Sequence, residues 1–466
     1  MISTKMRQVM AKAADGFGVG LFEGQDLAEL ISESLEDSGK WQQRSCSLTA
    51  PLVVFFVVSM ALNRSTSIKC LLLQLLGWMR AKTPRLSLRA VTPEAVCHAR
   101  KRLGSAPLKA LFEKLADRIK APASFHGFKV WAVDGVRMTM PDTPANEAEF
   151  GRPSASRGIA AFPQMMAIAI VETTSRLVQN VLLGKHDDAE RDGFGRMLSK
   201  LGVGDLLLMD RGFAATWLFD LMLSKKIAFL SRIGNTWNPV KLKRLGDGDW
   251  LVRVAGPDCS ANEAKIRRSK KEKIGKVVLT LRMIEYKIGE NERIRVLTDL
   301  LDPVAYPARE LAVLYHSRWE SELSYDELKT HLAAVSHGTL HTVFRSKTPD
   351  GVRQEAYGLF VAYNLIRALM QEAGEEHHVP PREISFIETL HLVRNALPEF
   401  ERAKAEEIGR LSERLLADIA ASRLDRYRRN RAYPRVVKVK MTKFKCKRSG
   451  HRQTVVDFND ELRLCA

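Results

Sequence analysis

The sequence has few cysteines, no long apolar segment and no glycine-rich phosphate loop. Its 466 residues include six cysteines with no Cys-x-x-Cys pair, so neither a disulfide scaffold nor a zinc-finger array is expected. The longest apolar run, residues 52–62, is too short to cross a bilayer and predicts a buried helix. Residues 1–20 lack the apolar core of a signal peptide, and no motif indicates a nucleotide cofactor. We therefore expect an intracellular protein without membrane contact.

Acidic residues are too few to balance the basic ones. Lys and Arg number 73 and Asp and Glu 54, which gives a formal net charge of +19. Such a balance predicts a polyanionic partner, most often nucleic acid. Residues 422–452 carry thirteen Lys or Arg against one acid, Asp425, with interleaved aromatic residues. This segment is either a solvated arm or, as its aromatic residues favour, a contact for phosphate backbones.

The first quarter of the chain is predicted to be helical. Apolar residues recur at helical spacing from about residue 26 to 119, and Thr92-Pro93-Glu94 has the composition of a helix start. The far end of that helix is basic. This region is either a helical bundle with a solvated basic face or a domain that docks on DNA. A chain of this length is expected to form two to four domains.

The middle of the chain predicts a mixed sheet with helices packed on it. Strand-like runs occupy residues 129–134, 165–171, 177–183, 205–210 and 227–233, and helices are expected at 189–201 and 214–223. Residues 235–302 interrupt this pattern with further strands, which indicates a β-rich insertion. Helices return at 308–332 and 350–373.

Two predicted strands each end in a carboxylate, Asp134 and Asp210. A charge at the end of a buried strand is costly unless it is paired. Each aspartate alone is explained equally well as a turn residue, because Gly135 and Gly212 follow closely. The two gain functional meaning only with a third acidic group.

The predicted helix at 308–332 offers that group. At about 100° per residue, four of its residues fall within an arc of roughly 60°, flanked by apolar side chains: Tyr315, Arg318, Glu322 and Lys329. The row is either a buried structural ion-pair network or part of a catalytic cleft, and Asp326 lies close enough to compete with Glu322. Three carboxylates without Cys or His favour Mg²⁺ or Mn²⁺.

These four residues match without a gap the pattern Tyr-x2-Arg-x3-Glu-x6-Lys. The chain thereby resembles the bacterial insertion-element transposases of the DDE class, in the insertion sequence four family. Residues 133–135 and 206–213 match two further blocks of that family, in the same order. The resemblance extends over nearly the whole chain.

The resemblance implies an α/β fold with an RNase H-like catalytic core of the retroviral integrase superfamily. It implies a helical DNA-binding domain at residues 1–120, a catalytic domain at 121–375 with the β-rich insertion at 235–302, and a helical and basic C-terminal region at 376–466. It implies that Asp134, Asp210 and Glu322 are catalytic and bind Mg²⁺, for which Mn²⁺ substitutes. DNA phosphates would be contacted by Tyr315, Arg318, Lys329 and Arg232.

The implied function is that of a DNA transposase located at the nucleoid in the cytoplasm. It would bind the terminal inverted repeats of its element as a homodimer on paired ends of double-stranded DNA. Water would cut each end, and the freed 3′-hydroxyl would then attack target DNA, two phosphoryl transfers without a covalent enzyme intermediate. The alternatives are a related metal-dependent nuclease without strand transfer and a catalytically silent DNA-binding protein.

Overall fold

The computed structural model describes residues 21–22, 26–41, 48–64, 66–82, 92–155, 158–289, 293–332, 343–424 and 457–465. The basic segment beyond residue 424 lies outside these residues. The chain forms two units. The first holds Met1–Ala121, Gly135–Asp188 and Glu320–Arg423, and the second holds Pro122–Asp134, Ala189–Trp319 and Leu424–Ala466. The chain passes repeatedly from one unit to the other, so the sequence-continuous domain boundaries given above stay predictions.

The predicted N-terminal helices are confirmed in the first unit, as α2 (Leu27–Asp37), α3 (Ala50–Leu62), α4 (Ile68–Lys82), α5 (Pro93–Leu103) and α6 (Ala106–Asp117). Thr92 caps α5 by accepting the Ala95 N–H at 3.3 Å, as its sequence predicts. The apolar run forms α3, whose thirteen residues are all buried. A helix that is apolar on every side belongs at the centre of a core.

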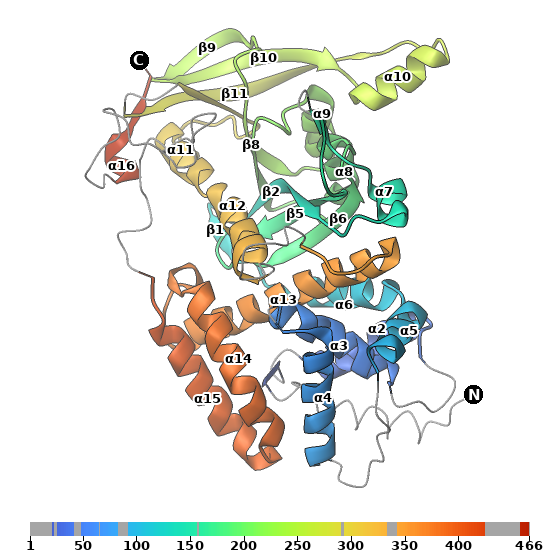
Figure 1. Ribbon diagram of the computed structural model, residues 1–466. Helices are drawn as coiled ribbons and strands as arrows, with labels where there is room; N and C mark the ends of the chain where they lie inside the picture. Colours follow the sequence, from blue (N-terminus) through green and yellow to red (C-terminus); the bar gives the residue numbers. More distant parts are fainter. Residues whose placement is uncertain are drawn as a thin grey trace. The chain divides into compact units, whose positions relative to one another are not determined.

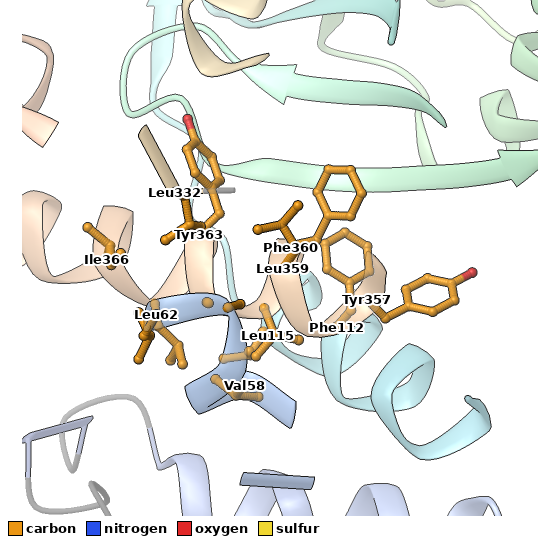
Figure 2. Close-up of a cluster of buried hydrophobic side chains, with 14 of the residues drawn as sticks. Val58, Leu62, Phe112, Leu115, Leu332, Tyr357, Leu359, Phe360, Tyr363 and Ile366 are labelled. Carbon is orange, nitrogen blue, oxygen red and sulfur yellow. The ribbon is translucent and has the colours of Figure 1, made fainter. Parts of the chain in front are cut away.

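The long helix α13 (Pro349–Glu376) completes that core. It packs against α3, α6, α14 (Phe386–Arg402) and α15 (Ala405–Ala421). Figure 2 shows Phe360 and Ile366 of α13 beside Leu62 of α3 and Phe112 of α6. The first unit also contains α7 (Pro144–Phe150), η4 (Pro381–Glu383), the short strands β3 (Ser154–Ala155) and β4 (Gly158–Ile159), and the hairpin of β5 (Gln164–Glu172) and β6 (Val178–Lys185).

The second unit is built on a mixed sheet. Its elements as far as β8 are β1 (Ala123–Phe125), β2 (Phe128–Thr139) up to Asp134, α8 (Glu190–Met197), η2 (Leu198–Lys200), β7 (Asp205–Met209), α9 (Thr216–Ser224) and β8 (Ala228–Arg232). β2 and β7, and β7 and β8, pair in parallel. The whole sheet also includes β5, β6 and the end of β2, which are counted in the first unit, and its order β6-β5-β2-β7-β8 places the third, second, first, fourth and fifth core strands in a row. This is the RNase H-like order, and it confirms the expected fold class.

Residues 235–302 extend this same sheet. The strands are β9 (Val240–Gly246), β10 (Asp249–Pro257), β11 (Lys276–Ile288) and β12 (Ile294–Thr298), and β12 pairs antiparallel with β8. Figure 1 shows β9, β10 and β11 side by side, with α10 (Ala261–Ser269) at one end of the ribbon they form. The chain returns to this sheet at its C-terminus, where α16 (Phe458–Glu461) leads into β13 (Leu462–Leu464), which pairs with β11.

Two sequence-based expectations are corrected. The strand expected to end at Asp134 continues for five residues, because Val136 and Met138 alternate inward and are buried. The single helix expected at 308–332 is three segments, α11 (Ala308–His316), α12 (Trp319–Asp326) and a π-helix at Glu327–Leu332. The 100° spacing used to align its residues therefore does not hold along its length. No helix within the described ranges is long and apolar enough to span a membrane.

Candidate active site

Asp134 and Asp210 stand at the same level of two adjacent strands. Val133 of β2 is in register with Met209 of β7, and the strands are parallel, so the next residue on each strand is one of the two aspartates. Both aspartates are half-buried. Sequence reasoning predicted two carboxylates at strand ends, and the register brings these two together within the second unit.

The turn after β7 binds the Asp210 carboxylate through a backbone N–H. The Gly212 N–H donates to Asp210 Oδ1 at 2.7 Å. A side chain at residue 212 would place its Cβ 2.9 Å from that same oxygen, which is too close for an unstrained contact. Glycine at 212 therefore leaves the Asp210 carboxylate in this position, from which a side chain would displace it.

Tyr315 links α11 to the strand that carries Asp210. Its hydroxyl donates to the Met209 carbonyl oxygen at 3.1 Å, and its side chain is buried. Burial raises the pKa of Tyr315 well above its usual range, with the charges of Arg318, Asp210 and Arg232 acting on it in opposite directions. Those three charged groups and Tyr315 are thus neighbours in the second unit.

The two arginines of this neighbourhood are held differently. Arg318 lies between α11 and α12, is largely buried, and places its guanidinium carbon 5.1 Å from the Trp319 ring centroid. Arg232 ends β8 in register with Val296 of β12 and is half-buried. Both also act on Tyr286, whose pKa burial raises above its usual range while their charges lower it. The site therefore brings two carboxylates and two guanidinium groups into one neighbourhood.

Glu322 and Lys329 belong to the first unit. Glu322 is half-buried on α12, and Lys329 is exposed on the π-helix. The competing acid, Asp326, is exposed and accepts the Thr330 hydroxyl at 2.7 Å. Across the residues that the structure describes, no three His, Cys, Asp or Glu side chains gather closely enough to hold a metal ion. Asp134 and Asp210 still offer a pair of carboxylates, and the oxygen chemistry of that pair fits Mg²⁺.

Arg282 is a supporting residue that the sequence analysis missed. Its side chain is fully buried on β11 and binds Asp249 at 2.7 and 2.8 Å. It also donates to the carbonyl oxygens of Leu300, Asp302 and Tyr306, in the loop that leads into α11. An arginine within the apolar alternation of residues 277–286 was the available signal.

The basic end of α5 divides into structural and exposed groups. Arg100 donates to Gln354 Oε1 at 2.7 Å and to the Ser346 hydroxyl at 3.0 Å, so it braces the first unit. His98, Lys101 and Arg102 are exposed. The DNA-docking interpretation of this helix therefore rests on those three side chains.

Comparisons with known proteins place the chain in a family. Residues 126–365 match the family described as "Transposase DDE domain". Residues 21–113 match the family described as "Insertion element 4 transposase N-terminal". The transposase InsG for insertion sequence element IS4 of Escherichia coli (strain K12) is 31% identical over 428 residues, covering 89% of this chain and 91% of that protein. The putative transposase InsZ of the same strain is 27% identical over 135 residues, 28% of this chain and 44% of that protein.

A similar solved structure is the cryo-EM structure of piggyBac transposase in a synaptic complex with hairpin DNA. It has a TM-score of 0.43 and 10% identity and covers 84% of this chain and 83% of that chain. The two family matches and the InsG relative, together with the RNase H-like strand order, identify this chain as a member of the IS4 family of DDE transposases, and so as a DNA transposase.

Proposed function

We propose that this transposase binds the terminal inverted repeats of its own insertion element, cleaves each end and joins the freed 3′-hydroxyl to target DNA. The observation that carries the proposal is the register of Val133 with Met209, which aligns Asp134 with Asp210. Such a pair needs one further carboxylate, and Glu322, from the family pattern, is the acid we assign. We propose that the reaction takes place in the cytoplasm, at the nucleoid, where the substrate lies.

Asp134, Asp210 and Glu322 would hold Mg²⁺, with Mn²⁺ as a substitute. When bound, such ions favour an in-line displacement at phosphorus by activating the attacking oxygen and neutralising charge on the leaving one. The protein's own contribution is to fix the carboxylate oxygens: the Gly212 N–H orients Asp210. Arg318 and Arg232, beside the same strand ends, would neutralise and orient the phosphate to be cut.

Tyr315 and Lys329 complete the proposed contacts with the transposon end. Lys329 is exposed and can reach a phosphate as a point charge. The single O–H proton of Tyr315 is donated to Met209, so a Tyr315–phosphate contact would require that hydrogen bond to open. We therefore expect Tyr315 to support Asp210 in addition to any contact with DNA.

DNA beyond the cut site would be contacted by a basic ribbon on β9, β10, α10 and β11. Between residues 240 and 280 the ribbon exposes ten cationic side chains and three acidic ones. The ten are Lys241, Lys243, Arg244, Arg253, Lys265, Arg268, Lys270, Lys271, Lys273 and Lys276. Lys241 Nζ lies 4.0 Å from the Trp250 ring centroid. This charge excess suits phosphate backbones of any sequence.

The test is a cleavage and strand-transfer assay with the element's own ends, Mg²⁺ and a target plasmid. Wild-type protein should cut the ends and join a pre-cut end to the plasmid, and Glu322→Gln should do neither while Asp326→Asn retains both. Cleavage without joining would favour the nuclease alternative. No cleavage with any divalent metal would favour a silent DNA-binding protein. Cross-linking with and without paired ends tests the proposed homodimer.

A further inference from the structure

A network of largely buried charges holds the segment that carries Glu322. Glu327, the first residue of the π-helix, accepts from Arg176 Nη1 at 2.6 Å and from the Tyr363 hydroxyl at 3.0 Å, and it also binds Arg367. Arg176 Nε reaches Glu320 at 2.6 Å. The side chains of Arg367 and Arg176 are 0% and 5% exposed. All these residues belong to the first unit.

The two acids of this network lie on either side of Glu322 in sequence. Glu320 precedes it by two residues and Glu327 follows it by five. Between them, the Tyr325 hydroxyl accepts the Ala169 N–H of β5 at 3.0 Å. The segment is therefore fixed at three points, to the β5–β6 hairpin and to α13.

Arg176, which makes these contacts, has an unusual backbone conformation. Its φ of 63° lies in the left-handed region, which disfavours residues other than glycine. It occupies the turn of the β5–β6 hairpin, where the Glu172 carboxylate accepts the N–H groups of Thr174 and Ser175. Such a conformation persists when its surroundings over-determine it, and such sites often serve function.

The network is electrically balanced, with two carboxylates against two guanidinium groups. A buried set of this kind needs no substrate charge to complete it, and removing one member would leave an uncompensated charge in the interior. Stability alone is a weak reason for such a set, because well-packed apolar residues can replace it. Its geometric effect is to fix the α12 segment, including the turn from α12 into the π-helix.

We propose that Arg176, Glu327 and Arg367 are positioning residues that orient the α12 segment and hold Glu322 in the geometry required for reaction. The inference rests on the proposed catalytic role of Glu322. Substituting a residue that orients a metal-binding carboxylate changes the apparent affinity for the metal. Substituting a residue that merely stabilises the fold leaves that affinity unchanged.

The test measures single-turnover cleavage of bound end DNA by full-length protein over a range of Mg²⁺ concentrations. Glu327→Gln should lower the rate at saturating Mg²⁺ by about 10- to 100-fold and raise the half-saturating Mg²⁺ concentration several-fold. Its affinity for end DNA in EDTA should stay within about twofold of wild type. Tyr363→Phe, which removes one hydroxyl from the network, should shift the half-saturating concentration in the same direction and serves if Glu327→Gln fails to fold.

The matched control is Glu355→Gln. Glu355 is a buried carboxylate of the first unit on the same helix as Arg367, and it pairs with Arg64 at 3.5 Å and Arg100 at 3.3 Å. Its loss should lower the melting temperature but leave the half-saturating Mg²⁺ concentration unchanged. The proposal is overturned if the network variants that fold keep the wild-type Mg²⁺ dependence. A wild-type protein that never cleaves would instead contradict the proposed function.

Discussion

Tyr315 donates its phenolic proton to the carbonyl oxygen of Met209, one residue before Asp210. This bond joins the end of α11 to the end of β7 within the second unit. It gives the first residue of the family pattern a structural role beside the candidate site. The tyrosine ring is buried in the same core as Leu208 and Leu311, so the bond is shielded from water.

Replacing Tyr315 with phenylalanine should separate its structural role from its proposed contact with a DNA phosphate. The variant keeps the buried ring and leaves the Met209 carbonyl without its donor, so the free energy of unfolding should fall by about 1–3 kcal/mol. End cleavage should slow because the Asp210 strand end loses its support, and affinity for end DNA should fall slightly because Tyr315 is one of the proposed phosphate contacts. Urea unfolding and a filter-binding titration measure the two quantities. Weaker end binding at unchanged stability would instead assign Tyr315 to a phosphate contact.

Asp134 and Asp210 should both be essential for end cleavage, whereas Asp205, at the other end of β7, should not. Asp210→Asn and Asp134→Asn each remove a charged oxygen donor, so end cleavage should fall at least about 100-fold while end binding in EDTA is retained. The matched control is Asp205→Asn, at the opposite end of β7. Its amide oxygen can still accept the Trp131 indole N–H seen at 2.8 Å, although the Gly202 N–H at 2.8 Å loses its carboxylate acceptor. Loss of cleavage in all three variants would point to damage to β7 rather than to the site.

The sequence predicted the core strands well because each is a short apolar run with clear boundaries. It did not predict β9, since that strand alternates Lys with apolar residues on an exposed edge and has no apolar run. The local glycine signal after Asp134 was misleading, because buried Val136 and Met138 extend β2 through Gly135. Long-range packing decided both cases.

The sequence indicated which residues to consider for the candidate site, but it did not predict how the helix that carries several of them is divided. Nothing local in Ser317-Arg318 breaks a helix, for neither residue is proline or glycine. The helix ends at this point because Tyr315 is hydrogen-bonded to Met209 and Arg318 is buried. A helical wheel shows only the spacing of residues along the helix and so cannot reveal these tertiary contacts. The buried partners of Glu327 were equally hidden, since Arg176 and Arg367 lie 151 and 40 residues away in the chain.

The basic ribbon should contribute to DNA affinity through phosphate contacts. Replacing Lys243 and Arg253 by alanine should weaken binding similarly for end and unrelated DNA. It should also reduce the slope of log affinity against log salt by about 0.9 for each lost phosphate contact. The control is Lys129→Ala with Lys225→Ala, which changes exposed residues at the start of β2 and at the C-terminal cap of α9. Equal slopes for both double variants would exclude the ribbon from the DNA interface.

Glu327 should also leave a signature in the pH dependence of stability. Burial alone would raise its pKa, but Arg367 and Arg176 outweigh that effect and hold the pKa below its usual value of 4.5. A carboxyl with a lowered pKa in the folded state contributes stability that is fully present above its unfolded pKa and is lost as the pH falls through its folded pKa. Between pH 6 and pH 8, about 1.5 units or more above the usual carboxyl pKa, wild type should therefore have a higher free energy of unfolding than Glu327→Gln by a constant amount.

The difference in unfolding free energy should shrink below pH 4.5, as urea titrations at each pH would measure. A difference that grows on acidification would mean that Glu327 is protonated in the folded protein, contrary to its place between two arginines.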